Sequence, residues 1–142
     1  MDKTAVLFVC THNSARSQMA EGLLRDRYGD HYDVYSAGTE RAHVRALAAE
    51  VMEEIGVDLS GHTSNTIEDL GDRTFDVVVT VCDAAREACP YLPAEKENRH
   101  RSFEDPSAAE GSTEERRAVF RRVRDDLAAW IDDTFAPEAP AA

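Results

Sequence analysis

The sequence predicts a single α/β domain: a four-stranded parallel open sheet with helices on both faces. Three observations support this fold class. Apolar runs at residues 5–9 and 75–81 have the length of buried strands, and the second is rich in β-branched residues. Segments with a helical repeat of apolar residues alternate with these strands. The chain of 142 residues has the length of one domain, and neither a linker nor an internal repeat divides it.

The remaining elements follow from local patterns. Gly29 and Gly56 stand where glycine commonly ends a helix, and Ser112 with Glu115 has the spacing of a capping box that opens the last helix. Alternating strands and helices imply right-handed β-α-β units. We expect a domain over 1–135 and a loose tail over 136–142. The expected strands are 5–9, 33–36, 75–81 and 101–103, and the expected helices are 17–28, 44–55 and 113–135, with one or two helical turns at 66–70.

The charge balance excludes several functions. The formal net charge is −12, and no basic stripe is available to neutralise nucleic-acid phosphates. The apolar runs are too short to cross a membrane, and no secretory signal precedes the first strand. We therefore expect a cytoplasmic monomer that binds neither nucleic acid nor membranes. Lys3 and Lys96 are the only lysines. Adaptation to high salt and an arginine-rich genome composition explain this bias equally well.

The segment after the first strand has the pattern of an oxyanion-binding loop. Cys10 and Arg16 enclose five residues between a strand and a helix. Curled backbone N–H groups, the helix N-terminus and a two-pronged guanidinium together suit phosphate or arsenate. The same positive field favours the thiolate form of Cys10, to which Ser17 can donate a hydrogen bond. The candidate anion-binding residues are Thr11, His12, Asn13, Ser14, Ala15, Arg16 and Ser17.

Asp105-Pro106 is a candidate for the second part of the site. Removing an oxygen from a tetrahedral centre requires a proton donor for the leaving group, and a carboxyl group can supply that proton. Asp-Pro is also a common turn. The catalytic interpretation of Asp105 therefore depends on the loop.

The chain has two more cysteines, Cys82 at the end of the third strand and Cys89 seven residues later. Cysteines in a cytosolic protein do not form a disulfide framework, and the spacing of Cys and His does not suit zinc. The carboxyl ends of parallel strands share one crevice, so Cys10 and Cys82 can lie close together. If the residues between Cys82 and Cys89 are helical, a disulfide between these two thiols requires the helix to unwind. They form either a redox switch or two half-buried thiols.

Together these residues resemble the low-molecular-weight protein tyrosine phosphatase family. The resemblance rests on the loop, Glu21, the turn at 36–38 and Asp105-Pro106. Cys82, Cys89 and the sequence at 62–64 are similar to its thioredoxin-coupled arsenate reductase branch. The similarity covers roughly residues 4–135.

The resemblance implies a catalytic cycle. Cys10 attacks arsenate held by Arg16 and the loop, and Asp105 protonates the departing hydroxide. Cys82 then attacks Cys10 and releases arsenite, and Cys89 attacks Cys82. The resemblance also implies that thioredoxin reduces the resulting Cys82–Cys89 disulfide. Arsenic detoxification would be the biological role, and phosphate or sulfate would act as mimics of the substrate.

The sequence departs from the family pattern at two positions. Ala15 stands where related loops often carry another cysteine, which the cycle above does not need. No tightly bound cofactor is expected, but some members bind potassium. The matching positions are Asn13, Glu21, Ser36 and Asn65. Asn65 replaces an aspartate, which removes a charge but leaves an amide oxygen as a ligand.

Two other functions fit parts of the pattern. A phosphatase would use Cys10, Arg16 and Asp105 with water, but it has no use for Cys82 and Cys89. A redox-gated oxyanion-binding module would bind the anion without turnover.

Overall fold

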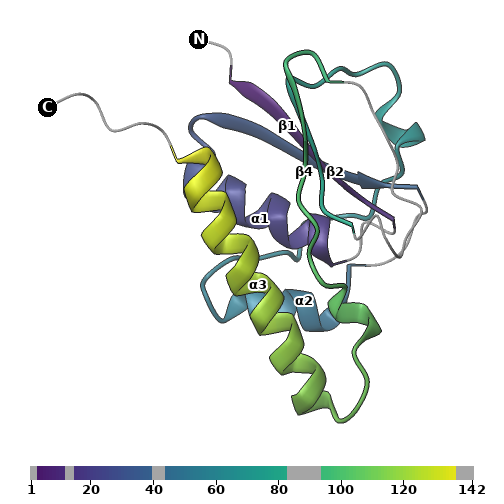
Figure 1. The fold of residues 1–142 in the computed structure, drawn as a ribbon, viewed down its shortest axis with the longest axis vertical. Coiled ribbons are helices and arrows are strands. Elements are labelled where there is room, and N and C mark those ends of the chain that lie inside the picture. Colours follow the sequence, from purple (N-terminus) through teal and green to yellow (C-terminus); the bar gives the residue numbers. More distant parts are fainter. Residues whose placement is uncertain (1–2, 12–14, 40–43, 83–93, 137–142) are drawn as a thin grey trace, which may run out of the picture.

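The computed structural model describes residues 3–11, 15–39, 44–82 and 94–136. The elements are arranged in layers, with the three α-helices packed together on one side of the sheet (Figure 1). In chain order, they are β1 (Thr4–Cys10), α1 (Arg16–Tyr28), β2 (Tyr32–Gly38), α2 (Ala46–Glu53), the 3-10 helix η1 (Glu68–Leu70), β3 (Val77–Thr80), β4 (Glu97–His100), the 3-10 helix η2 (Pro106–Ala108) and α3 (Thr113–Phe135).

The four strands form one parallel sheet in the order β2-β1-β3-β4. Val6 of β1 pairs with Val34 on one side and with Val77 on the other. The prediction of a single α/β domain with a four-stranded parallel sheet is therefore confirmed. The chain leaves β1 for β2 on one side and returns to β3 on the other. This switch point, at the carboxyl end of β1, is where open α/β sheets bind ligands.

Both faces of β1 are buried, as its continuous apolar sequence predicts. Val6 and Phe8 belong to the core between the sheet and the three α-helices. Leu7 and Val9 belong to a smaller core on the opposite face. Ile67, beside η1, packs against this second core. One face is therefore covered by α-helices and the other by the η1 region.

The structure corrects two boundaries. The fourth strand spans Glu97–His100 rather than 101–103, and its side chains are mostly exposed. An edge strand of this kind carries no apolar alternation, so the sequence pattern could not locate it. α2 covers Ala46–Glu53 within the predicted 44–55. The chain turns at Gly56 with a φ of 80°, a conformation that glycine adopts without strain. The last helix and its capping box between Ser112 and Glu115 match the prediction.

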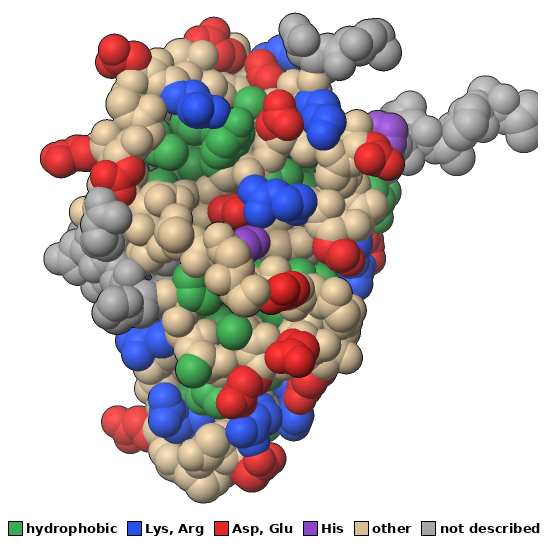
Figure 2. Space-filling view, turned by 180° about the vertical axis from the view of Figure 1, so that it is seen from behind, with side chains coloured by type: hydrophobic (Ala, Val, Ile, Leu, Met, Phe, Trp, Pro, Cys, Tyr) green, Lys and Arg blue, Asp and Glu red, His purple; other side chains and the backbone are tan. Residues whose placement is uncertain are grey.

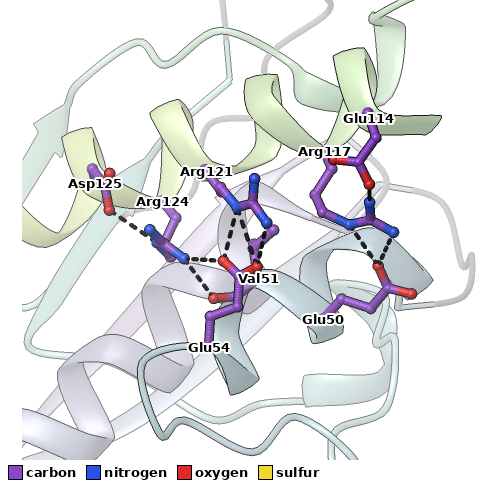
Figure 3. Close-up of polar contacts among 8 residues, drawn as sticks. All are labelled: Glu50, Val51, Glu54, Glu114, Arg117, Arg121, Arg124 and Asp125. Carbon is purple, nitrogen blue, oxygen red and sulfur yellow. Dashed lines mark hydrogen bonds and ion pairs between the residues drawn. The ribbon is translucent and has the colours of Figure 1, made fainter. Parts of the chain in front are cut away.

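Arginines on α3 hold carboxylates on α2 (Figure 3). Arg121 donates to both carboxylate oxygens of Glu54, with its Nη2 2.6 Å from Oε2. Arg124 also donates to Glu54, and its Nη1 reaches the Val51 carbonyl at 2.8 Å. Arg117 pairs in the same way with Glu50 and with Glu114 of its own helix. These contacts fix α2 against α3 outside the apolar core.

Glu54 should make stability depend on pH. Hydrogen bonds from Arg121, together with Arg124, lower the pKa of Glu54 from 4.5 to about 2. A depressed carboxyl pKa stabilises the fold above the unfolded value, and this contribution is lost as the pH falls toward 2. We expect Glu54→Gln to lower Tm by a few degrees at neutral pH and to flatten the loss of stability between about pH 4.5 and pH 2. The matched control is Glu53→Gln on the same helix, where the exposed side chain forms no ion pair with the described residues. Equal Tm values for both variants, from thermal unfolding followed by circular dichroism across this pH range, would contradict the expectation.

Charges of both signs are distributed over the surface. On the face shown in Figure 2, acidic side chains are spread widely and basic side chains lie among them. None of the helices in the described part of the chain is both long and apolar enough to cross a membrane.

Candidate active site

A small pocket opens at the switch point of the sheet. Its volume is about 150 Å³, which is below the roughly 300–1,000 Å³ of pockets for drug-sized ligands. Its size suits a small ion. The described residues that line it are Cys10, Ala15, Arg16, Arg45, Asp105, Ser107 and Ala108.

Cys10 is the last residue of β1, and its buried side chain is not part of a disulfide. The residue is 2% exposed, and its Sγ lies 2.9 Å from the hydroxyl oxygen of Ser17. Ser17 is fully buried in the first turn of α1. A hydroxyl at this distance can donate a hydrogen bond to a thiolate. The structure therefore brings together the two residues for which the sequence predicted this contact.

Arg16 is the first residue of α1 and is only 3% exposed. Its Nη1 donates to the carbonyl oxygen of Phe103 at 3.3 Å. The helix begins after Ala15, whose side chain has no acceptor for a cap, and no acidic residue lies in the first turn. The positive end of the helix therefore lies at the pocket that Ala15 and Arg16 line. The guanidinium and the helix end supply positive charge at the same pocket.

Asp105 comes to this site from a distant part of the chain. It caps η2 by accepting the backbone N–H of Ser107 at 2.9 Å on its Oδ1. Its Oδ2 lies 3.8 Å from Nη2 of Arg16. The side chain is 33% exposed, so the carboxyl group is open to the pocket and to solvent. This placement suits a group that exchanges a proton with a bound anion.

Cys82 follows β3, next to the end of β1. The N–H of Val81 donates to the carbonyl of Val9 at 3.0 Å, which continues the pairing of β3 with β1. Cys82 is fully buried in the same core cluster as Cys10. It is disulfide-bonded, whereas Cys10 is not. The third predicted cysteine, Cys89, lies outside the described residues.

Only part of the predicted anion loop can be placed. The carbonyl of Thr11 accepts a hydrogen bond from the Thr39 hydroxyl at 3.0 Å, which ties the start of the loop to the end of β2. The predicted loop residues at 12–14 lie outside the described part of the chain. Ala15, Arg16 and Ser17 are all buried.

Three of the predicted potassium ligands, Glu21, Ser36 and Asn65, are among the described residues. Glu21 is 8% exposed and accepts a hydrogen bond from the Ser36 hydroxyl. Its other oxygen lies 2.7 Å from Nη1 of Arg25. The amide of Asn65 donates to the Thr63 carbonyl at 3.3 Å. The Glu21 carboxylate therefore already has a guanidinium beside it.

His62 completes this arrangement. Burial lowers the pKa of its imidazole and favours the neutral ring. A neutral ring protonated at Nδ1 satisfies both of its contacts, with Gln18 Oε1 at 2.9 Å and with Arg25 Nη1 at 3.2 Å from Nε2. The predicted segment at 62–64 therefore forms hydrogen bonds with Gln18 and Arg25 of α1.

Two polar residues of the pocket, Arg45 and Ser107, were not predicted from the sequence. Arg45 precedes α2, and nothing near it in the sequence indicates a site. Ser107 directly follows the Asp105-Pro106 pair in the sequence, and its closeness to a predicted site residue could have identified it. Both are brought to the pocket by the packing of α2 and η2 rather than by a local motif.

Comparisons with known proteins agree with this geometry. The sequence profile of the low molecular weight phosphotyrosine protein phosphatases matches residues 5–136. An arsenate reductase of Halalkalibacterium halodurans is 49% identical over 136 residues, which cover 96% of this chain and 97% of that protein.

Solved structures are similar as well. An arsenate reductase in a phosphate-binding state has a TM-score of 0.75 and 35% identity, covering 92% of this chain and 95% of that one. A thioredoxin-dependent arsenate reductase of Corynebacterium glutamicum has a TM-score of 0.66 and 26% identity, covering 92% of this chain and 61% of that one.

Proposed function

This chain belongs to the low molecular weight phosphotyrosine protein phosphatase family, and we propose that within it the protein is a cytoplasmic arsenate reductase. The observation that carries the proposal is the buried Cys10 thiol beside the buried Arg16 guanidinium in a pocket of about 150 Å³. Relatives with 42% to 49% identity are arsenate reductases.

The first step is attack on arsenate. The Cys10 thiolate forms a bond to arsenic, and Ser17 stabilises the sulfur by hydrogen bonding. Arg16 and the N-terminus of α1 hold the negatively charged oxygens. One arsenic–oxygen bond breaks, and Asp105 donates a proton so that the oxygen leaves as water. Arsenic remains in the +5 state in the resulting thiol adduct.

The second step supplies two electrons. The Cys82 thiolate attacks the sulfur of Cys10, a disulfide forms, and the electron pair of the sulfur–arsenic bond stays on arsenic, which leaves as arsenite. Two thiols are oxidised while arsenic goes from +5 to +3. Cys89 then attacks Cys82 and frees Cys10, and thioredoxin reduces the Cys82–Cys89 disulfide. Support comes from a disulfide-bonded Cys82 in the same core cluster as Cys10, which is not in a disulfide, and from the thioredoxin-dependent structural relative.

A coupled assay tests this function. Purified protein is given arsenate, thioredoxin, thioredoxin reductase and NADPH, and the loss of NADPH absorbance is followed together with arsenite release. We expect one NADPH consumed per arsenite, and no activity in Cys10→Ser, because a serine hydroxyl is a much poorer nucleophile and cannot form the disulfide. Hydrolysis of p-nitrophenyl phosphate is measured in parallel. Efficient hydrolysis without arsenate-dependent NADPH loss would favour the phosphatase alternative. Phosphate binding with neither hydrolysis nor arsenate reduction would favour the oxyanion-binding module.

We also propose that the cycle needs no potassium. The Arg25 guanidinium already neutralises Glu21, and the amide oxygen of Asn65 accepts a hydrogen bond from the Thr63 hydroxyl. The coupled assay should therefore run at the same rate in potassium chloride and sodium chloride at equal ionic strength. A clear preference for potassium would contradict this.

A further inference from the structure

Two polar groups line the pocket without partners among the described residues. The Arg45 guanidinium forms neither a hydrogen bond nor an ion pair within the described ranges. The hydroxyl oxygen of Ser107 is buried and bonds to none of the described residues. Neither group has a role in the cycle outlined above.

Of the two arginines among the described pocket residues, Arg45 is the one without a carboxylate partner in the described ranges. Arg16, the other pocket arginine, lies near the Asp105 carboxylate. Arg121 and its neighbours on α3 hold carboxylates on α2. Arg45 remains exposed at the pocket in a chain with a formal net charge of −12. A cation without a carboxylate partner in such a chain is available to an incoming anion.

The Ser107 hydroxyl indicates the same kind of ligand. A buried hydroxyl without a hydrogen bond is unfavourable, and native structures rarely keep one without a reason. Ser107 is one of the residues that line the pocket, and its single heavy-atom torsion lets the hydroxyl change direction between staggered rotamers. An anion there would give this donor the acceptor that the protein does not provide.

Both residues extend from fixed positions. Arg45 is the N-cap of α2, and its carbonyl accepts from the N–H of Ala49 at 3.1 Å. The ion pairs of Glu50 and Glu54 hold that helix against α3. Ser107 lies in η2, where its backbone N–H is held by Asp105. A donor presented from a fixed backbone loses less entropy on binding than one on a free loop.

We propose that Arg45 and Ser107 form a second set of oxyanion donors, in addition to Arg16 and the N-terminus of α1. The ligand is a doubly charged tetrahedral anion, arsenate as substrate or phosphate as its mimic, and for the identity of the substrate this rests on the proposed function. Arg45 supplies charge at the pocket opening, and Ser107 supplies a hydrogen bond beside the proton donor Asp105. The pair therefore determines affinity for the anion rather than the chemistry at Cys10.

Inorganic phosphate is the probe, and its Kd is measured by isothermal titration calorimetry at low and high ionic strength. We expect Arg45→Ala to weaken binding about fivefold at low ionic strength, with most of the effect lost at high ionic strength because the residue is exposed. Arg45→Lys should keep most of the affinity. The matched control is Arg73→Ala, which removes the same charge from an arginine that instead donates to the Tyr35 hydroxyl. If both alanine variants change the Kd equally, Arg45 has only a general electrostatic effect and the proposal is wrong.

Ser107→Ala should weaken phosphate binding about tenfold, as expected for a lost hydrogen bond to a charged group. Without ligand, its Tm should equal or exceed that of the wild type, because an unpartnered buried hydroxyl is removed. Ser107→Thr should restore binding.

In the arsenate assay, both alanine variants should raise KM more than they lower kcat. Unchanged phosphate Kd and arsenate KM in both alanine variants would overturn the inference while arsenate reduction stands. Wild-type protein that binds phosphate with these variant effects but does not reduce arsenate would overturn the proposed function alone.

Discussion

Replacing Cys82 with serine is expected to abolish steady-state arsenate reduction. The serine hydroxyl cannot attack the sulfur of Cys10 to form a disulfide, so arsenite is not released from the adduct. Cys82 is fully buried in the same core cluster as Cys10, and its neighbour Val81 continues the pairing of β3 with β1. A position in this shared core cluster suits the proposed role of Cys82 as the thiol that resolves the Cys10 adduct. The coupled NADPH assay should show no rate above background.

Two controls separate this effect from misfolding. A serine at a buried apolar position costs stability because its hydroxyl lacks a partner, so Cys82→Ala is tested alongside it. Both variants should bind phosphate with the wild-type Kd, because Cys82 does not line the pocket. Wild-type turnover in either variant would eliminate the relay through Cys82.

Asp105→Asn is expected to lower kcat for arsenate by about 10²–10⁴-fold, the usual contribution of a general acid. Asparagine keeps a carbonyl oxygen that can accept the Ser107 N–H, so the cap of η2 is preserved. It has no acidic proton to give to the departing oxygen. The measurement is the initial rate at saturating arsenate, with thermal unfolding to verify the fold.

The pH profile distinguishes proton donation from a role in placing Arg16. A general acid must be protonated, so wild-type kcat should fall on the alkaline side and the asparagine variant should lose that limb. Glu104→Gln is the control, because this exposed neighbour pairs with Arg122 on α3 instead of facing the pocket. A variant that keeps the wild-type profile at a reduced rate would indicate that Asp105 only positions Arg16.

The sequence predicted those elements whose patterns are local. β1 and β3 are continuous apolar runs, and α3 has both a helical repeat and a capping box, so each could be located without knowledge of the fold. β4 was placed three to four residues too late because its exposed residues form no pattern. Its position depends on pairing between Val77–Thr80 and Glu97–His100, which only the assembled sheet determines.

The residues of the candidate site also divide into those that a local sequence pattern identifies and those that it does not. Cys10 and Arg16 belong to one short loop, so their spacing was visible. The prediction of Asp105 depended on the loop, because Asp-Pro alone is a common turn, and the structure places Asp105 near Arg16 across 89 positions of sequence. Arg45 and Ser107 were not predicted, because their places depend on how α2 and η2 pack. The ion pair between Glu21 and Arg25 on α1 was not predicted either, although the two residues lie one helical turn apart in the predicted helix.

β4 ends the sheet on the side away from β2, and the side chains on this edge affect whether two copies of the protein can associate through their sheets. An open strand edge is a template onto which a second copy can add a strand, which leads to aggregation. Here the edge strand has four residues, and three of them are exposed polar or charged side chains, including Arg99 and His100. Adding a second copy would require burying those charges. The polar sequence that hid β4 from pattern analysis therefore protects the protein against edge-to-edge association at high concentration.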